Sequence, residues 1–386
     1  MSIATAVVAV DSTVKAGYRD LLAALKATGL LAGGARSMLP HVELAAGDGA
    51  LTVTAADAGA AVTVSLPATV TGSGRVMVPW AELSKILPAA VKGTSKRQLD
   101  QLSVDIDITG DTATLGVGGY SLPITVAPDA TLPTIPQATP GTHVADRDQF
   151  AAMFTRVVAA AGTDQLLPIF THVHTTLTDT QVTMLATDRY RLSRGTIDAH
   201  GTSNQTILLP GPLLAKLLPF CDGTQIILGT DGHDTNQWIT LTSGTLTVRI
   251  LHPHGDYPRV THLFNLTNAS TATLDRTAFR DAADRAHALT TVLAERNTPA
   301  RLIINTNQVT IAPGTRDRTA DAPTITADTH HTDTFTGGIN PAYLLDGINH
   351  THGDTITIEF NIPGKPIKLT GTDTFEHVIM LMRLPD

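Results

Sequence analysis

Three His-x-His pairs have a spacing that could bind a metal ion. They are His172 and His174, His252 and His254, and His350 and His352. Residues two apart on a β-strand share a face, so such a pair could chelate a metal ion. A hydrolytic metal site also needs a carboxylate or a third histidine at ligand spacing, and none of the pairs has one. The sequence therefore predicts no catalytic residue, no metal ligand and no cofactor. Because the histidine pairs are present, a metal-dependent hydrolase remains the competing hypothesis.

Other signatures of chemistry are missing. The chain has no nucleophile elbow, no P-loop and no dinucleotide-binding glycine motif. Its single cysteine, Cys221, excludes a disulfide framework and a cysteine-based zinc site and fits a reducing compartment. The sequence thus favours a binding protein over an enzyme.

The composition narrows the class of protein further. The chain has 386 residues, of which 42% are hydrophobic and 16% charged, and its net charge is −8. No run approaches the ~18 apolar residues of a membrane span, and the first ten residues lack a basic secretory start. We therefore expect a cytoplasmic protein with no membrane contact. Any nucleic-acid binding must use a local patch, because a chain with this negative net charge should not bind nucleic acid through its whole surface.

One pattern of predicted helices and β-hairpins recurs three times along the chain. Strand-turn-strand patterns occupy residues 39–57, 167–188 and 298–312, at offsets close to one third of the length. A helical stretch precedes each hairpin, at 17–31, 146–161 and 275–295. A second, shorter amphipathic helix follows near 80, 211 and 341. Period-two alternation at 102–108 and 354–360 indicates strands with one buried face.

These repeats predict an α+β protein in which each unit packs two helices on antiparallel sheet. A proline-rich stretch at 127–140 ends the first unit, and residues 258–268 end the second. The expected domains are 1–135, 136–262 and 263–386.

Four segments resemble the bacterial DNA polymerase III β subunit, the replicative sliding clamp. They read LATDRYRL at 185–192, VLAERNTP at 292–299, NPAYLL at 340–345 and VIMLMRL at 378–384. The segments lie in the family's order and in the matching repeats, so the resemblance covers the whole chain. It implies three clamp-type domains per chain and a homodimer that closes a six-domain ring around double-stranded DNA.

The resemblance also implies a non-catalytic processivity factor with peptide-binding partners. These would be the DNA polymerase III catalytic subunit, the clamp loader and other proteins with a clamp-binding motif. They would dock in a pocket between the second and third domains. Carried over by motif, the pocket residues are Phe170, Thr187, Arg189, Tyr190, Arg191, Leu192, Arg259, Val260, Asn340, Tyr343, Val378, Ile379, Met380, Leu381, Met382, Arg383 and Leu384.

This chain departs from the family pattern at several of these positions. Arg189 stands where a glycine or serine is usual, and Leu381 replaces a proline. Gly255 and Pro258 also differ from the usual residues. These departures favour, as an alternative, a specialised second clamp with an altered pocket, for example one that tolerates an inhibitor.

Two more surfaces follow from the resemblance. The dimer interface would join Tyr120 and Leu122 of one protomer to Val292 and Leu293 of its partner. The DNA-facing side chains would be basic residues on the helices and in the loops before the hairpins: Arg19, Lys26, Arg36, Lys85, Lys92, Arg156, Lys216, Arg280, Arg285 and Arg296. A closed ring needs only weak phosphate contacts, because topology retains the DNA.

Overall fold

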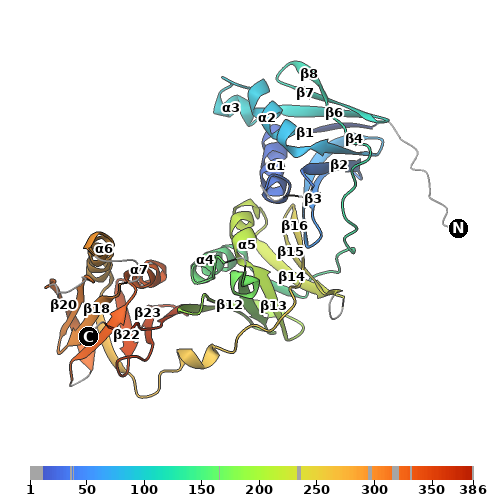
Figure 1. The fold of residues 1–386 in the computed structure, drawn as a ribbon. Helices are drawn as coiled ribbons and strands as arrows, with labels where there is room; N and C mark the ends of the chain where they lie inside the picture. The colour runs from blue at the N-terminus through green and yellow to red at the C-terminus, as the bar shows by residue number, and fades with distance from the viewer. Residues whose placement is uncertain are drawn as a thin grey trace. The chain divides into compact units, whose positions relative to one another are not determined.

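A computed structural model describes residues 12–34, 37, 39–164, 166–232, 236–293, 298–314, 321–330 and 333–384 (Figure 1). They form two compact units. Unit 1 comprises Met1–Asp148 and Lys216–His252, and unit 2 comprises Gln149–Ala215 and Pro253–Asp386. Helices α4 (Arg147–Val158) and α5 (Gly211–Leu217) run across the boundaries in sequence. Arg36 and Arg296 lie outside the described residues.

Unit 1 holds two antiparallel sheets that share strand β4. One runs in the order β4-β1-β6-β7-β8 and the other in the order β5-β2-β3-β4-β16-β15-β14-β9. The elements are β1 (Ser12–Gly17), α1 (Tyr18–Ala32), β2 (His41–Gly47), β3 (Ala50–Ala56), β4 (Ala60–Thr71), β5 (Gly74–Pro79), α2 (Trp80–Ala90), α3 (Lys96–Leu99), β6 (Ser103–Thr109), β7 (Thr112–Val117), β8 (Tyr120–Ile124), β9 (His143–Asp146), the 3-10 helix η2 (Leu218–Phe220), β14 (Gln225–Asp231), β15 (Trp238–Ser243) and β16 (Leu246–Leu251).

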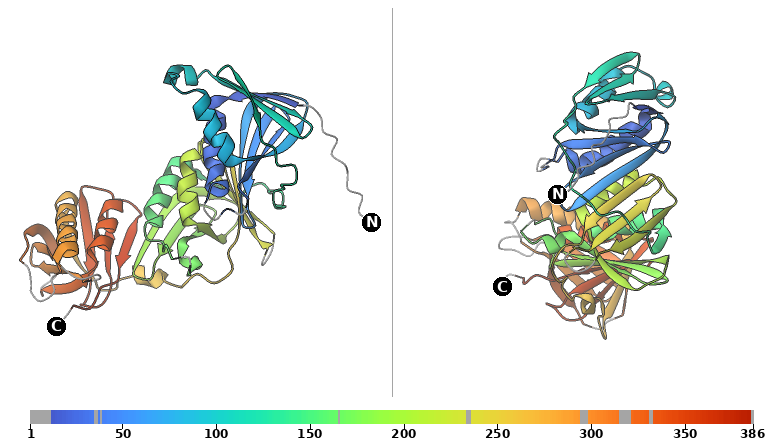
Figure 2. Two further views of the ribbon diagram at one scale, coloured as in Figure 1. Left: turned by 45° about the horizontal axis from the view of Figure 1, so that its top comes forward. Right: turned by 90° about the vertical axis from the view of Figure 1, so that its right-hand side faces the viewer.

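Helix α1 covers one face of the unit 1 strands (Figure 2). It buries Leu21 and Leu25, four residues apart, against β3 and β4, as expected for one helical face. The indole nitrogen of Trp80 donates to the carbonyl of Leu25 at 2.7 Å and ties α2 to α1. Burial of this apolar stripe against alternating strand residues forms the core of the unit.

Unit 2 is built in the same way, with β20 as the shared strand. Its sheets run β13-β10-β11-β12-β24-β23-β22-β17-β20 and β21-β18-β19-β20. The elements are the 3-10 helix η1 (Pro168–Thr171), β10 (His172–Leu177), β11 (Gln181–Thr187), β12 (Arg191–Gly201), β13 (Gln205–Pro210), η4 (Thr261–Phe264), β17 (Ser270–Asp275), α6 (Arg276–Leu293), β18 (Ala300–Asn305), β19 (Gln308–Ala312), β20 (Thr324–His330), β21 (Phe335–Ile339), α7 (Pro341–His350), β22 (Thr355–Phe360), β23 (Ile367–Thr370) and β24 (Glu376–Ile379).

Helices α6 and α7 lie side by side against β19 and β24 (Figures 1 and 2). Their starts follow from the sequence. The side chain of Asp275 accepts from the backbone N–H of Ala278 at 2.7 Å, and that of Asn340 accepts from Ala342 at 3.0 Å. Each side chain satisfies a backbone donor that has no partner within the helix.

The elements confirm the predicted α+β class and the threefold repeat of local structure. The predicted hairpins are β2–β3, β10–β11 and β18–β19, preceded by α1, α4 and α6 and followed by α2, α5 and α7. The predicted alternating strands are β6 and β22. The three-domain boundaries remain a prediction.

Candidate functional site

The turn between β11 and β12 is closed by two side chains of the LATDRYRL segment. The Thr187 hydroxyl donates to the carbonyl of Arg191 at 2.8 Å and accepts from the N–H of Arg189 at 3.0 Å. One Asp188 carboxylate oxygen accepts from the N–H groups of Tyr190 and Arg191, both at 3.0 Å. Threonine and aspartate are suited to this role because their short side chains reach nearby backbone donors. The turn is thereby fixed.

Arg191 is anchored on both sides of its guanidinium group. Its Nε lies 3.0 Å from an Asp188 carboxylate oxygen, and its Nη1 forms an ion pair with Asp346 of α7. The guanidinium carbon also lies 4.5 Å from the ring centre of Tyr343. Burial, with the charge of Asp188 next, raises the pKa of the Tyr343 hydroxyl. Arg191 is therefore a wall residue with its charge already balanced.

A cleft of about 260 Å³ lies beside this turn in unit 2. Five of the predicted pocket residues line it: Phe170, Arg189, Tyr190, Arg191 and Tyr343. Sequence reasoning missed the rest of its wall, which is residues 161–164, Leu167 and Asp188. The only signal for Asp188 was its place in the TD motif, and no local pattern pointed to the loop at 161–164.

Other predicted pocket residues are buried next to the cleft. Leu192 and Val378 form a cluster with Leu185 and Phe264, against which Tyr257 and Val260 pack. Ile379 belongs to the core of the C-terminal half of unit 2. Leu192 is 1% exposed and Val378 0%. Their side chains are packed in the protein interior and do not line the cleft.

The C-terminal segment at 380–384 is joined to the turn beside the cleft and to β21 by backbone hydrogen bonds. The N–H of Met380 donates to the carbonyl of Tyr190 at 2.8 Å, and the N–H of Met382 donates to that of Gly338 at 2.8 Å. Met380, Leu381, Met382 and Leu384 are partly buried, whereas Arg383 is exposed, as is Arg259 before η4. Thr187 is buried within the turn, and Asn340 is the partly buried first residue of α7.

Strands β12 and β24 join the two halves of unit 2 beneath the cleft. They pair from Arg191 opposite Ile379 to Arg194 opposite Glu376. Between them the Ser193 hydroxyl and His377 Nδ1 lie 2.7 Å apart, with the histidine fully buried. Arg194 forms an ion pair with Glu376. Lys368 is shared by Glu359 at 3.0 Å and Glu376 at 3.4 Å.

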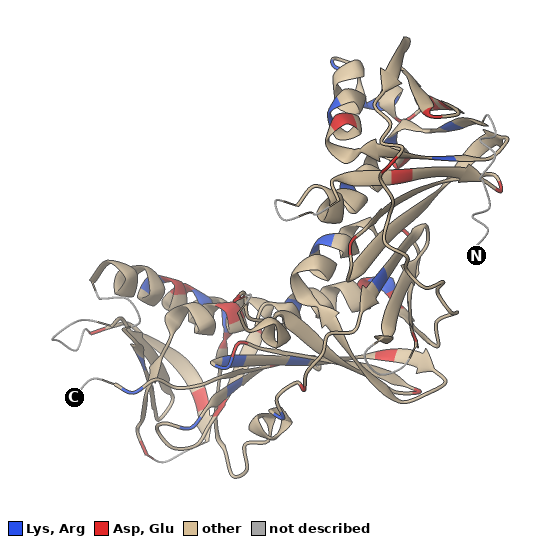
Figure 3. Ribbon diagram, turned by 45° about the vertical axis from the view of Figure 1, so that its right-hand side comes forward, with Lys and Arg blue, Asp and Glu red and all other residues tan. Residues whose placement is uncertain are grey.

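Most of the basic residues predicted to face DNA are exposed on or beside helices. Five of them form no ion pair with another described residue: Lys26, Lys85, Lys92, Lys216 and Arg285. Arg19 pairs with Asp100, and Arg280 with Asp281 at 3.1 Å. Charges of both signs are sparse along the ribbon (Figure 3). Among the described helices and sheets, none by itself forms a strongly basic surface of the kind that binds DNA by charge alone.

The prediction that Arg156 faces DNA is wrong. Its side chain is buried at 7% exposure, and its guanidinium contacts Asp373 and the carbonyl of His350. A guanidinium already held by these acceptors has no free face for a phosphate. The residue therefore has a structural role and is not among the residues proposed to face DNA.

Histidine rings of these pairs contact neighbouring backbone carbonyls or an aromatic ring and, among the described residues, do not converge on a common metal position. His172 Nδ1 lies 2.8 Å from the carbonyl of Pro168, and the His174 ring packs at a tilt against Tyr257 with ring centres 5.1 Å apart. His350 Nδ1 lies 2.7 Å from the carbonyl of Asp346. Within the described ranges no cluster of three His, Cys, Asp or Glu residues could hold a metal ion. No observation here favours the hydrolase hypothesis.

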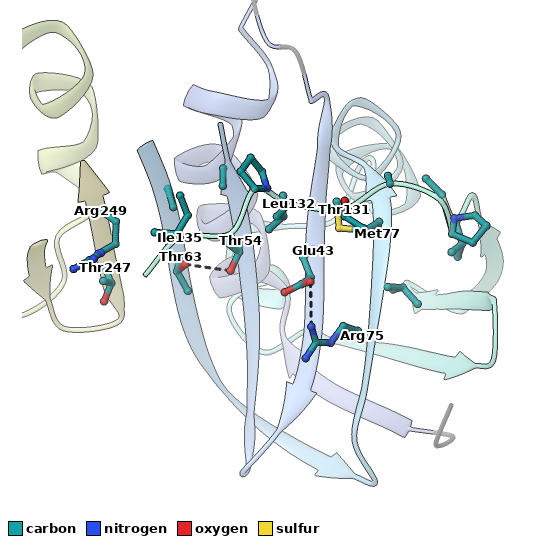
Figure 4. A pocket seen from close by; sticks show the side chains of 18 of the residues that line it. Glu43, Thr54, Thr63, Arg75, Met77, Thr131, Leu132, Ile135, Thr247 and Arg249 are labelled. Atoms are coloured by element: carbon teal, nitrogen blue, oxygen red, sulfur yellow. Dashed lines mark hydrogen bonds and ion pairs between the residues drawn. The ribbon is translucent and has the colours of Figure 1, made fainter. Parts of the chain in front are cut away.

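Unit 1 has a larger hollow, of about 690 Å³, on the outer face of its sheet (Figure 4). The segment carrying Leu132 and Ile135 passes over the strands there. The polar side chains in the hollow pair with one another. Thr54 and Thr63 hydroxyls lie 3.1 Å apart, and Glu43 and Arg75 approach to 4.0 Å. No predicted site residue lines it, so the cleft in unit 2 remains the candidate site.

Several known proteins are similar to this chain. Residues 262–383 match the family model for the C-terminal domain of the DNA polymerase III beta subunit. A beta sliding clamp from Streptomyces coelicolor is 27% identical over 386 residues, covering 95% of this chain and 98% of the relative. The beta sliding clamp homolog GriR from Streptomyces muensis is 26% identical over 311 residues, covering 78% and 77%. The solved DNA polymerase III beta subunit of Thermotoga maritima superposes with a TM-score of 0.83 at 16% identity, covering 97% of this chain and 100% of that one.

The fold and the site therefore place the chain in the class of bacterial sliding-clamp folds. Within that class its sequence is similar to a beta sliding clamp along nearly its full length, and residues 262–383 match the C-terminal domain of the DNA polymerase III beta subunit.

Proposed function

We propose that this chain is a DNA sliding clamp, a non-catalytic processivity factor. The observation that carries the proposal is the full-length match to a beta sliding clamp, with 95% of this chain and 98% of the relative covered. As a clamp it would form a homodimeric ring around duplex DNA and act in the cytoplasm. None of the helices in the described ranges is long and apolar enough to cross a membrane.

The ring would consist of three domains per chain, at 1–135, 136–262 and 263–386. Two strand junctions support this division, because each joins sheets across a proposed domain boundary. Strand β4 pairs with β16 from Ala60 opposite Ile250 to Val64 opposite Leu246, and β12 pairs with β24. A third junction of the same kind would join β8 to the partner protomer and close the ring.

The bore would carry the exposed basic side chains of the helices, without Arg156. Weak phosphate contacts suit a protein that must slide, and the net charge of −8 limits adhesion elsewhere. The cleft in unit 2 would receive peptides of the polymerase, the clamp loader and other partners. Met380 and Met382, on the neighbouring C-terminal segment, would extend the binding surface and adapt to different side chains.

Retention on circular DNA tests the ring. The chain is incubated with a nicked plasmid, a bacterial clamp loader and ATP, and then separated by gel filtration in high salt. We expect it to stay with the circular plasmid and to be lost when a restriction enzyme linearises the DNA. Equal retention on linear DNA with a steep loss in salt would identify a phosphate-driven binder instead.

Calorimetric titration with a peptide containing Gln and apolar Leu or Phe anchors tests the pocket. Met382→Ala removes a partly buried apolar side chain from the segment proposed to extend the pocket, and we expect it to cost about 1–3 kcal/mol of binding free energy. Leu381→Pro restores the residue usual in the family and we expect it to shift affinity too. Unchanged affinity in both variants would show that partners bind elsewhere.

A specialised second clamp is the other candidate. The match to the beta sliding clamp homolog GriR and the unusual Arg189 and Leu381 favour it. A second clamp gene in the same genome would support this role. Growth supported by this chain as the sole clamp would support the housekeeping role.

A further inference from the structure

Arg189 projects an uncommitted positive charge at the mouth of the unit 2 cleft. It is exposed, and its backbone φ is +81°, in a region that non-glycine residues rarely adopt. No carboxylate of the described residues approaches its guanidinium within 4.0 Å, whereas neighbouring Arg191 has two. An unusual backbone angle that presents a charged side chain is a reason to ask what that side chain binds.

Two aromatic rings hold this guanidinium in place. Its central carbon lies 5.8 Å from the ring centre of Phe170 and 5.6 Å from that of Tyr190. Both distances are within the ~6 Å range of cation–π attraction to the face of an aromatic ring. No hydrogen bond joins the side-chain N–H groups of Arg189 to another described residue, and these groups match the two oxygens of a carboxylate.

The acidic residues of the cleft do not compete for it. Asp188 is occupied by Arg191 and by the backbone N–H groups of the turn. One Asp164 oxygen accepts from the backbone N–H of Leu166 at 2.9 Å. Beside Arg189 the cleft also offers apolar surface from Leu167 and the Tyr343 ring. A ligand that pairs with Arg189 can therefore place an apolar group against this surface at the same time.

We propose that Arg189 makes this cleft select peptides that carry a carboxylate next to their apolar anchor side chain. The inference rests on the proposed function, because it assumes that the cleft binds partner peptides. It adds the chemistry of the partner, which is an acidic residue adjacent to Leu or Phe that pairs with Arg189.

The experiment is a double-mutant cycle by calorimetric titration. Amidated peptides with Gln, Leu and Phe carry one Asp immediately before or after the Leu-Phe pair, and each has an Asn twin. They are titrated into the full chain, Arg189→Gln and Arg97→Gln. Arg189→Gln keeps a side chain at the same backbone angle but removes the charge. Arg97→Gln makes the same net-charge change on exposed α3.

We expect one Asp peptide to bind about three- to tenfold more tightly than its Asn twin to the wild type and to Arg97→Gln. With Arg189→Gln the two peptides should bind equally, and the wild-type preference should shrink as salt rises. Equal binding of the twins to the wild type, with clear affinity for both, would overturn the inference and leave the proposed function intact. No binding of any peptide would overturn both.

Discussion

Arg156 and Asp373 form a two-pronged ion pair inside unit 2. Arginine Nη1 lies 2.5 Å from Oδ2 and Nη2 lies 3.0 Å from Oδ1. The same guanidinium donates to the carbonyl of His350 at 2.6 Å and lies 4.4 Å from the ring centre of Phe375. Burial alone would raise the pKa of Asp373, but the hydrogen bonds from Arg156 and from the backbone of Phe375, together with the charge of Arg156, outweigh burial and the pKa is lowered. The pair ties helix α4 to the segment before β24.

Arg156→Met should destabilise the folded protein. It leaves Asp373, whose side chain is 32% exposed, without its cation and removes the hydrogen bond to the His350 carbonyl, so we expect a cost of about 1–3 kcal/mol. The free energy of unfolding, from urea titration at neutral pH, measures the effect. Arg280→Met is the matched control, since it breaks an exposed pair in which both side chains are 47% exposed, and should cost less than about 1 kcal/mol. Equal losses would show that Arg156 is not held as the geometry indicates.

The role of Arg156 illustrates what the sequence could not predict. Its position on a helix is the same as that of a solvated or DNA-facing arginine, because its partner Asp373 is distant in sequence and no periodicity links the two. Asp346, which pairs with Arg191, was missed for the same reason. Long-range ion pairs depend on how elements pack, and hydrophobic periodicity does not report that packing.

The hairpins and helix starts could be predicted because their causes are local. Asp275 and Asn340 accept hydrogen bonds within their own first helical turns. Thr187 and Asp188 close a turn between adjacent strands. In contrast, the motif could not distinguish Tyr190, which is exposed at the cleft, from Leu192, which lies in a buried cluster two residues later.

His377 should make the stability depend on pH. Burial, with the positive charges of Arg191 and His350 adding, lowers its pKa to about 3. An unfolded histidine titrates near 6.5, so between these values the unfolded chain binds a proton that the folded chain does not. The free energy of unfolding must then fall as pH falls below ~6.5, by up to about 1.4 kcal/mol per pH unit.

Urea titrations at neutral and mildly acidic pH measure this slope. His377→Gln stays uncharged throughout, so the slope should be smaller by that amount. His330→Gln is the control, because His330 is 77% exposed and should leave the slope unchanged. A wild-type slope in His377→Gln would mean that the buried ring is not what couples folding to protons.

Arg189→Gly should be more stable than Arg189→Ala, by about 1 kcal/mol. Both variants lose the contacts with Phe170 and Tyr190, so these cancel in the comparison. Only glycine adopts the φ of +81° without a steric cost. Thermal and urea unfolding of the two variants give the difference. An alanine variant as stable as the glycine variant would mean that the turn relaxes away from this backbone angle.

The proposed dimer can be tested at the end of helix α6. Val292 is 82% exposed and Leu293 51%, and Tyr120 on β8 is 60% exposed. Among the described strands β8 pairs only with β7, so its outer edge can accept another strand. Such exposed apolar side chains beside a free strand edge favour association.

We expect a dimer at micromolar concentration by sedimentation, and a marked loss of it in Val292→Asp. Placing a charge in the core of an interface costs on the order of 2 kcal/mol or more, equivalent to at least ~30-fold in the dissociation constant. Ile362→Asp is the control, because Ile362 is 62% exposed in a different loop and should leave the dimer intact. A monomeric wild type, or equal weakening by both substitutions, would rule out this interface, and the ring would then need another route to closure.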